Sequence, residues 1–343
     1  MGINPVVFGC EKKAMPGVDR ENKAMPQEKK PLISVVVPVY YNAETLKELH
    51  ARFNRLAEAV PDCSWEFIYV DDGSKDDSFK ILMEIKAGDD RVGLLRFVKN
   101  AGSHSAILAG LSFAKGDAVA FISADLQDDP MLLAEMAAEW KEGTPVVLAV
   151  REGREDSLAD KLLAKAYYFT IRGIAIPEMP EGGFDFALLD RSVVDIITDM
   201  QEKNTTLTGL IAWLGFPHKI IPYIRKAREK GNSKWTLRKK VKLTVDSILA
   251  FSYLPVRFIS LLGVLIFLGT LLYVGIIFAQ KVLFGIPVQG WASLMVAILL
   301  LSGIQMLSLG VLGEYIWRVL DAGRKRPPYI VYREFGSKYS REA

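Results

Sequence analysis

Short apolar runs alternate with helical patterns from residue 31 to residue 151, and this alternation restricts the fold more than any other feature of the chain. The apolar runs are rich in valine, isoleucine and phenylalanine, as buried strands are. Stretches such as residues 44–60 place leucine and phenylalanine at the spacing of an amphipathic helix. Strands and helices in short alternation predict an α/β fold with a mostly parallel sheet that helices cover on both faces. The predicted strands are residues 32–37, 65–70, 92–98, 119–122 and 146–150.

Acidic and amide side chains gather where the fourth predicted strand ends, at Asp125, Gln127, Asp128 and Asp129. Open α/β sheets bind ligands at the carboxyl ends of their strands. A hard divalent cation takes one or two carboxylates together with substrate phosphates. The stretch is therefore a candidate seat for a metal that holds a diphosphate. The alternative is an acidic turn that caps the helix expected over residues 131–141.

The turn after the first predicted strand disfavours a dinucleotide-binding domain. It consists of residues 38–42 (PVYYN) and contains no glycine. A dinucleotide-binding site needs glycine there, because the pyrophosphate must approach the start of the following helix closely. The chain also lacks a P-loop. Hydride transfer with a nicotinamide cofactor is thus disfavoured.

The net charge and the cysteine content further restrict the class of protein. The net charge of the 343 residues is only +3, which gives no overall electrostatic argument for binding nucleic acid. The two cysteines, Cys10 and Cys63, form neither a disulfide framework nor a metal-binding spacing, as in proteins of a reducing compartment. Residues 1–30 are polar and lack the apolar stretch of a signal peptide, so they are expected to form a disordered extension.

The second half of the chain carries a dense basic run and then two uncharged stretches. Nine lysines and arginines lie between residues 225 and 242, and apolar residues recur at helical spacing over residues 237–254. This pattern is typical of a helix on a membrane surface, with a nucleic-acid patch as the alternative. Residues 259–279 and 291–313 hold no charge, and each meets the length of about 20 residues needed to cross a bilayer. Two buried soluble helices are the alternative to two spans.

The basic residues on the outer flanks predict that both flanks are cytoplasmic and that the short linker between the spans lies outside. The expected organisation is an extension (1–30), a catalytic domain (31–236), an interfacial helix (237–255), two transmembrane helices within 256–318 (about 257–279 and 291–316) and a cytoplasmic tail (319–343).

Several short motifs, in their order and spacing, resemble the family 2 glycosyltransferases that load a sugar onto a polyprenyl phosphate. This family includes dolichyl-phosphate mannose synthase and bacterial enzymes that make undecaprenyl-phosphate sugars, and the resemblance covers residues 32 to about 320. The motifs are residues 38–40 (PVY), 70–74 (VDDGS), Asn100 with Gly102 and His104, residues 124–127 (ADLQ), 184–191 (FDFALLDR), and Arg228 with residues 231–235 (GNSKW).

The resemblance implies a glycosyltransferase-A fold and an inverting transfer from a nucleotide-diphospho-sugar, with uridine as the favoured base, for cell-envelope or lipopolysaccharide modification. It implies Mg2+ or Mn2+ at Asp125 and Gln127, and Asp125, Asp185 and Arg151 as catalytic residues. Whether Asp185 is a base or positions another group stays open. The implied donor-binding residues are Pro38, Tyr40, Asn42, Val70, Asp72, Ser123, Ala124, Arg228 and Lys234.

We further expect Arg151, Arg154 and Lys161 to receive the lipid phosphate, because guanidinium and ammonium groups suit that ligand. The chain is expected to be a homo-oligomer in a bacterial inner membrane, with its catalytic domain and both termini in the cytoplasm. Nucleic acid is not an expected partner.

Two positions depart from the family pattern. Ser123 stands where the family usually has an aspartate on the metal side, and Asn42 stands where it usually has an acid. The two departures are compatible with a distinct donor or with a weakened enzyme. Ser123 also keeps open a non-catalytic, membrane-tethered protein that binds nucleotide sugars. A polysaccharide synthase is the other alternative, but the chain lacks the Gln-x-x-Arg-Trp motif and the additional spans of that class.

Overall fold

The computed structural model of the chain describes residues 30–151, 168, 172–173, 176–180, 183–200, 206–224, 254–284, 290–324 and 326–342. Several predictions concern residues outside these ranges and stay predictions. They are the N-terminal extension, Arg154, Lys161, the basic run with Arg228 and Lys234, and nearly all of the interfacial helix.

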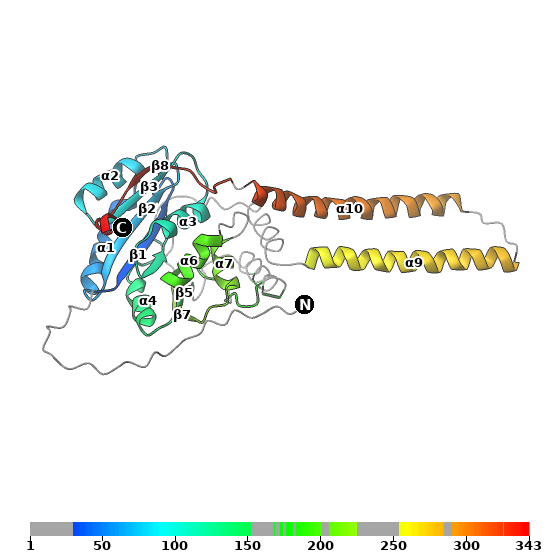
Figure 1. Ribbon diagram of the computed structural model, residues 1–343, viewed down its shortest axis with the longest axis horizontal. Coiled ribbons are helices and arrows are strands. Elements are labelled where there is room, and N and C mark those ends of the chain that lie inside the picture. The colour runs from blue at the N-terminus through cyan, green and yellow to red at the C-terminus, as the bar shows by residue number, and fades with distance from the viewer. Residues whose placement is uncertain are drawn as a thin grey trace, which may run out of the picture. The chain divides into compact units, whose positions relative to one another are not determined.

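An eight-stranded sheet forms the centre of the fold, in the order β7-β5-β6-β4-β1-β2-β3-β8 (Figure 1). Only β6 and β8 run opposite to the other strands. The mostly parallel sheet and its five predicted strands are confirmed. The strands are β1 (Leu32–Val39), β2 (Ser64–Asp71), β3 (Val92–Phe97), β4 (Ala118–Phe121), β5 (Val146–Arg151), β6 (Phe186–Asp190), β7 (His218–Tyr223) and β8 (Val331–Phe335).

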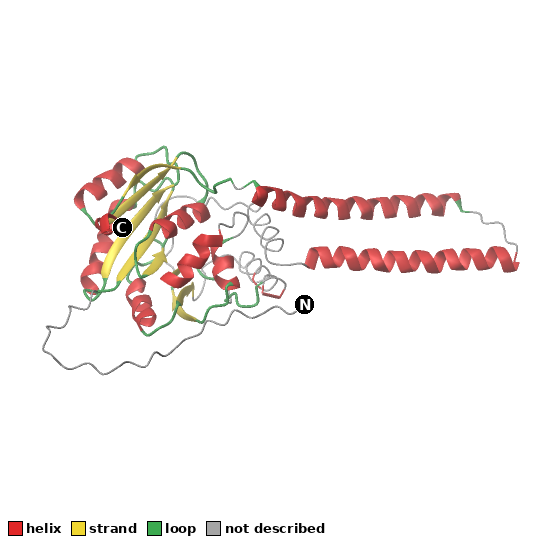
Figure 2. Cartoon of the chain, in the orientation of Figure 1, coloured by secondary structure: helices red, strands yellow, loops and turns green. Residues whose placement is uncertain are grey.

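Helices cover both faces of the sheet, as predicted (Figure 2). Successive residues of β1 and β2 are buried, which requires cover on both sides. On one side α3 (Ser103–Phe113) packs on β1 and β2, and α6 (Arg191–Met200) packs on β4 and β6. The other helices that the structure describes in this domain are α1 (Leu46–Ala59), α2 (Ser78–Gly88), α4 (Leu132–Lys141) and α7 (Leu207–Trp213).

The apolar stripe of α1 shows why the sequence folds in this way. Leu46, Leu49, Phe53 and Leu56 share one face at helical spacing and are all fully buried. The ring of Phe53 stacks on Phe67 of β2, with centroids 4.9 Å apart. Burying side chains of this size contributes about 1.5–3 kcal/mol each, so this face holds the helix on the sheet.

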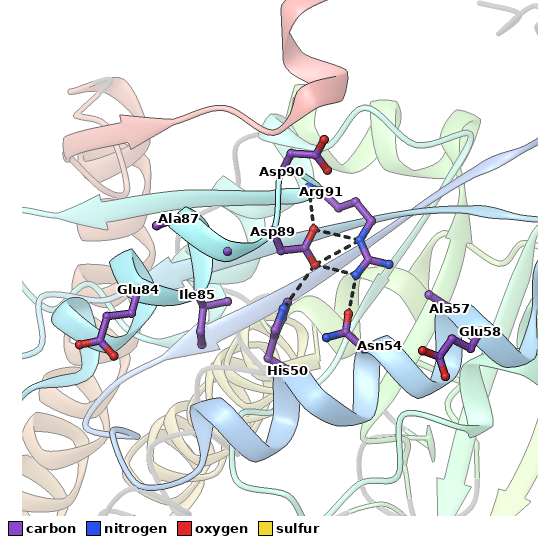
Figure 3. Close-up of a pocket in the computed structure, with 11 residues that line it drawn as sticks. His50, Asn54, Ala57, Glu58, Glu84, Ile85, Ala87, Asp89, Asp90 and Arg91 are labelled. Atoms are coloured by element: carbon purple, nitrogen blue, oxygen red, sulfur yellow. Dashed lines mark hydrogen bonds and ion pairs between the residues drawn. The ribbon is translucent and has the colours of Figure 1, made fainter.

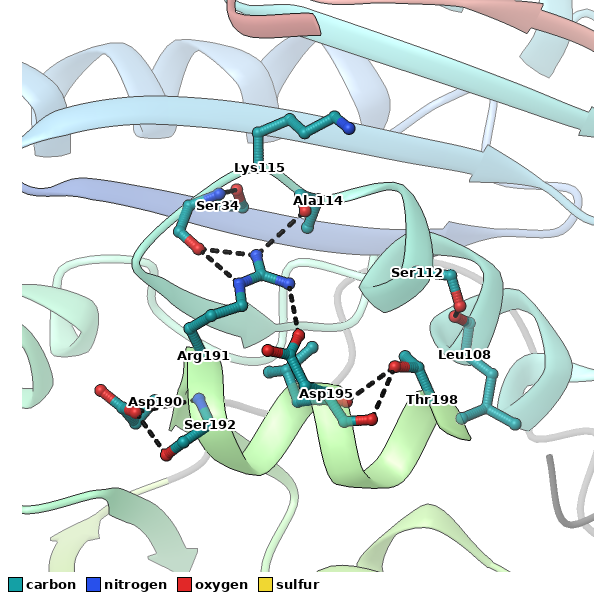
Figure 4. A network of polar contacts seen from close by, with 12 residues as sticks. Ser34, Leu108, Ser112, Ala114, Lys115, Asp190, Arg191, Ser192, Asp195 and Thr198 are labelled. Atoms are coloured by element: carbon teal, nitrogen blue, oxygen red, sulfur yellow. Dashed lines mark hydrogen bonds and ion pairs between the residues drawn. The ribbon is translucent and has the colours of Figure 1, made fainter. Parts of the chain in front are cut away.

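A polar network ties the start of α6 to the turn before β4 (Figure 4). Arg191 donates from Nε to the carbonyl of Gly116 at 2.9 Å and from a terminal nitrogen to that of Ala114 at 2.9 Å. A Cβ at Gly116 would lie 2.7 Å from the backbone nitrogen of Ser34, so only glycine fits. Arg191 ends the FDFALLDR motif, and its role is to fix the edge of the sheet that holds the amino ends of the parallel strands.

Two long helices, α9 (Leu254–Phe284) and α10 (Trp291–Gly323), contact each other. Among the residues that the structure describes, no helix is long and apolar enough to cross a membrane, so the two predicted spans are not confirmed.

The chain returns to the sheet after α10, where the sequence predicted a tail. β8 pairs antiparallel with β3 and becomes the last strand on that side. The ring of Tyr329 stacks on Phe97, with centroids 5.1 Å apart, and the backbone nitrogen of Val98 donates to the carbonyl of Ile330 at 3.1 Å. The C-terminal region is therefore part of the catalytic domain's sheet.

Ser337 ties the C-terminal segment to a buried carboxylate. Glu66 of β2 is fully buried and accepts hydrogen bonds from the hydroxyls of Ser34 and Ser337 and from the backbone nitrogen of Lys115. We expect Ser337→Ala to lower the free energy of unfolding by about 1–3 kcal/mol, because it removes a donor from a buried charge. Chemical denaturation measures this loss. Ser192→Ala, which removes an exposed hydroxyl bonded to Asp190, is the control and should change stability little; equal losses would contradict the assignment.

Candidate functional site

The predicted site residues converge where β4, β5 and β7 end and β6 begins. Because β6 runs antiparallel to its neighbours β4 and β5, its first residues lie at the edge that holds the carboxyl ends of those strands. Asp185 immediately precedes β6, and its backbone nitrogen donates to the carbonyl of Ala149 at 3.2 Å. One inserted antiparallel strand thus brings a residue from far along the chain beside Asp125 and Arg151.

Residues 123–128, which we call the acidic turn, form a compact cluster after β4. The hydroxyl of Ser123 lies 2.6 Å from Oδ1 of Asp125 and 2.9 Å from Oδ2 of Asp128, so its single proton is shared between two carboxylates. Oδ1 of Asp125 also accepts from the backbone nitrogen of Gln127 at 3.2 Å. Leu126, between Asp125 and Gln127, has φ 62°, a left-handed conformation that residues other than glycine rarely adopt because of their Cβ. Such strain is characteristic of functional sites.

The turn does not serve mainly as a helix cap. The residue before α4 is Met131, and it makes no side-chain capping bond. Asp129 is the acid nearest to the helix, and its Oδ1 accepts from the backbone nitrogen of Met131 at 3.1 Å. The bonds of Asp125 and Asp128 described above lie within the site instead. The capping alternative therefore applies to Asp129 and not to Asp125.

Arg151 and Asp185 form a bidentate ion pair beside the acidic turn. Nε and one terminal nitrogen of Arg151 each donate to a different oxygen of Asp185. Both side chains are about one-fifth exposed, at 23% and 19%, so the guanidinium can still receive a ligand. The guanidinium of Arg151 engages both carboxylate oxygens of Asp185. This geometry favours a role for Asp185 in orienting Arg151 and disfavours a role as a base.

Tyr223 is a member of the site that the sequence analysis missed. Its hydroxyl lies 2.7 Å from Oδ1 of Asp128 and 2.8 Å from Oδ2 of Asp185. Burial, followed by the charges of these two carboxylates, raises the pKa of the phenol well above its usual range, so it is a hydrogen-bond donor at neutral pH. Nothing local marks this tyrosine, because its partners lie 95 and 38 residues away.

Four of the predicted donor-binding residues, Pro38, Tyr40, Asn42 and Val70, lie at or just after the ends of β1 and β2. Val70 pairs in register with Pro38 and is fully buried. Tyr40 is 37% exposed, and its ring meets that of Tyr41 edge to face at 4.6 Å. The Asn42 side chain accepts from the backbone nitrogen of Tyr40 at 3.0 Å, so it stabilises this turn in place of the family's acid.

Asp72 is held by the loop that follows β3. Its carboxylate is 2% exposed and accepts from Asn100 Nδ2 and from the backbone nitrogens of Ala101 and Gly102 at 2.6–2.9 Å. Burial raises the pKa of Asp72, while the two backbone hydrogen bonds lower it in part. The structure thus assigns Asp72 a role in fixing this loop, and its contact with a nucleobase stays a prediction.

The oxygen atoms that this site offers suit a cation that arrives with phosphate ligands. In the described part of the chain, no three acidic, histidine or cysteine side chains form a ready cage for a metal. Mg2+ needs only one or two carboxylates when substrate phosphates complete its coordination. Among the described residues, the contacts above join three carboxylates, those of Asp125, Asp128 and Asp185, to one guanidinium, that of Arg151. A divalent cation would balance the formal charge of these four groups. The residues therefore fit Mg2+ or Mn2+ bound together with a diphosphate.

A separate cavity of about 900 Å3 lies between α1, the end of α2 and the start of β3 (Figure 3). His50 and Arg91 both contact Asp89 there, and Arg91 also donates to Asn54. Burial lowers the pKa of His50. The cavity lies toward the amino ends of the strands, and none of the predicted site residues lines it. It is therefore not part of the candidate site.

Ser123→Asp directly tests the effect of restoring the carboxylate that the family usually has at position 123. The new carboxylate would stand close to those of Asp125 and Asp128, and like charges at such distances disfavour one another. We expect a lower melting temperature without metal, a larger stabilisation by Mn2+ than in the wild type, and a lower half-saturating Mn2+ concentration. Ser123→Asn, of the same shape but uncharged, is the control and should not gain Mn2+ affinity. An unchanged Mn2+ response in Ser123→Asp would show that position 123 does not face the ion.

The chain is similar to one family model and to several known proteins. Residues 34–197 match the family model described as glycosyl transferase family 2. The chain is 39% identical over 309 residues to the uncharacterized glycosyltransferase YkcC of Bacillus subtilis (strain 168), covering 90% of this chain and 95% of that protein. It is 34% identical over 303 residues to a bactoprenol glucosyl transferase of Shigella phage SfV, covering 88% of this chain and 98% of that protein. Among solved structures, mannosyl-3-phosphoglycerate synthase from Rubrobacter xylanophilus matches with 17% identity and a TM-score of 0.46, covering 68% of this chain and 75% of that one.

Proposed function

This chain belongs to glycosyl transferase family 2 and is a glycosyltransferase, and from that premise we propose that it transfers a sugar from a nucleotide-diphospho-sugar to a polyprenyl phosphate. The acceptor is supported by relatives named bactoprenol glucosyl transferase that match nearly their whole length. The same names make a glucosyl donor the first to test, with uridine as the proposed base. The observation that carries the proposal is the Arg151–Asp185 pair beside the acidic turn, a cationic group next to a seat for a diphosphate-bound metal.

In the proposed reaction a phosphate oxygen of the lipid attacks the anomeric carbon while the bond from that carbon to the nucleoside diphosphate breaks. A single displacement inverts the anomeric centre. The lipid phosphate is already ionised near neutral pH, so the reaction needs no strong base, in keeping with the engagement of Asp185 by Arg151. Arg151 would hold the acceptor phosphate through its remaining donors.

Asp125 and Gln127 would hold Mg2+ or Mn2+, which supplies positive charge against the departing diphosphate. Arg228 and Lys234 are proposed as further cations on that diphosphate, and Arg154 and Lys161 as further contacts for the lipid phosphate. Transition-state charge grows on the leaving group, so cations at that position accelerate the step.

We also propose that the protein is attached to the bacterial inner membrane, with its catalytic domain on the cytoplasmic side. The support is the uncharged sequence of residues 259–279 and 291–313, with basic residues on their outer flanks. Large apolar side chains of α9 and α10, such as Leu272 (68% exposed) and Met306 (69% exposed), also suit an apolar environment. A lipid acceptor at headgroup depth would then be within reach.

The direct experiment supplies full-length protein in liposomes with undecaprenyl phosphate, uridine diphosphate glucose and Mn2+. Release of uridine diphosphate should depend on the lipid phosphate and should match the formation of a lipid that carries one sugar. A polymeric product would support a polysaccharide synthase. Donor binding without release, across a panel of nucleotide sugars, would refute the proposal in favour of a non-catalytic binding protein.

A further inference from the structure

The hydroxyl of Tyr223 lies between two carboxylates that come from different parts of the site. Asp128 belongs to the acidic turn after β4, whereas Asp185 precedes β6 and holds Arg151. A phenol carries one proton, so the two carboxylates share a single donor. This arrangement joins the two halves of the site through one oxygen atom.

The position of that oxygen is fixed by the sheet. Tyr223 ends β7 and pairs in register with Arg151, which ends the parallel strand β5. Its ring is 7% exposed and packs against Phe186, with centroids 5.5 Å apart and planes at 67°. Phe186 is the residue after Asp185. Packing and hydrogen bonding therefore hold the Tyr223 side chain against the same short segment. The hydroxyl therefore has little freedom to move.

Contacts continue from the hydroxyl in both directions. On one side Asp128 accepts from Ser123, which also contacts Asp125, the proposed metal ligand. On the other side Asp185 holds both donors of the Arg151 fork. An unbroken series of short polar contacts thus connects the group proposed to hold the donor's cation with the group proposed to hold the acceptor phosphate.

We propose that Tyr223 is a positioning residue that sets the distance between the acidic turn and the Arg151–Asp185 pair. This inference rests on the proposed function. Displacement at the anomeric carbon requires the attacking oxygen to lie about 3–3.5 Å away and in line, and a misplacement of about 1 Å costs about 100-fold in rate. A rigid link between the two binding groups provides that alignment before either substrate arrives.

Tyr223→Phe keeps the ring and its packing and removes only the hydroxyl. We expect kcat to fall by about ten-fold or more, while KM for the nucleotide sugar stays within about three-fold, because alignment is lost and donor binding is not. Tyr69→Phe is the matched control. Tyr69 is fully buried, and its hydroxyl contacts only the remote His50 in the hydrogen bonds described, at 3.1 Å. This variant should keep kcat within about two-fold of the wild type.

A kcat within about two-fold of the wild type for Tyr223→Phe would overturn the inference, and so would an equal loss in Tyr69→Phe, which would assign the effect to general destabilisation. A measurement without substrate separates this inference from the proposed function. The losses in melting temperature of Tyr223→Phe and Arg151→Lys should not add in the double variant, because both act on Asp185. Additive losses would refute the link even if the protein transfers sugar. A wild type that transfers no sugar would refute the proposed function and leave this coupling measurable.

Discussion

Replacing Asp125 by alanine should lower turnover by at least about two orders of magnitude, the loss expected when a key electrostatic contact to the transition state is removed. Asp125 is the partly buried acid of the acidic turn, and its Oδ1 already accepts hydrogen bonds from Ser123 and from the backbone nitrogen of Gln127. The alanine variant would therefore lose both the proposed metal ligand and the hydrogen bonds that order the turn. The rate at saturating nucleotide sugar and Mn2+ measures the combined effect.

Asp125→Asn separates these two contributions. The amide oxygen can accept the same hydrogen bonds, but it lacks the negative charge that a hard cation prefers. We expect the asparagine variant to keep most of its thermal stability and still lose most of its turnover. Asp129→Asn alters the neighbouring acid, which bonds the backbone of Met131, and should remain close to wild-type activity. Near wild-type turnover in Asp125→Ala would rule out the metal assignment.

Arg151→Lys should produce the second large loss, about 100-fold in kcat/KM for the polyprenyl phosphate. Lysine keeps the charge but cannot form the two parallel bonds that Arg151 makes with Asp185. The acceptor phosphate then meets a flexible point charge in place of an oriented fork. Steady-state kinetics with varied lipid phosphate measure the loss, which should appear mainly in the acceptor terms.

Arg91→Lys is a matched control for that variant. Arg91 forms a comparable fork with Asp89, but beside the remote cavity at the amino ends of the strands. Its replacement should reduce thermal stability and leave kcat/KM for both substrates nearly unchanged. If the two variants lost activity equally, the loss would report weakened folding, and Arg151 would have no special role toward the acceptor.

The sequence predicted the parts of the fold that local patterns encode. The five parallel strands are continuous apolar runs between amphipathic helices, and the structure confirms each of them. β6 was recognised only as part of the FDFALLDR motif and was not predicted as a strand. A short apolar run such as residues 186–190 fits a strand or a helix equally well. β8 lies in the segment predicted as a tail. Its sequence, residues 331–335 (VYREF), is short and includes two charged residues, so its apolar pattern is weak.

In the candidate site, too, local sequence patterns predicted some residues, whereas residues that depend on distant contacts were missed. Asp125 and Arg151 were found because they stand at the ends of recognisable strands. Tyr223 was missed because its role depends on contacts across the sheet. The hydrogen bonds that residues 100–102 donate to the Asp72 carboxylate were missed for the same reason. Ser123 was interpreted as a lost metal ligand. The structure adds that its hydroxyl lies between two acids, so the position is still engaged with the cluster.

The return of the C-terminus to the sheet has a consequence for how the protein is made. β8 pairs with β3, yet more than two hundred residues separate Phe97 from Val331. At the usual pace of protein synthesis, the ribosome needs on the order of 10–50 s to cover that distance. During this interval β3 is an open edge, and open edges favour pairing with other chains. The sheet is therefore completed only after β8 has been synthesised, later than both α9 and α10, so closure of the sheet follows synthesis of these two helices.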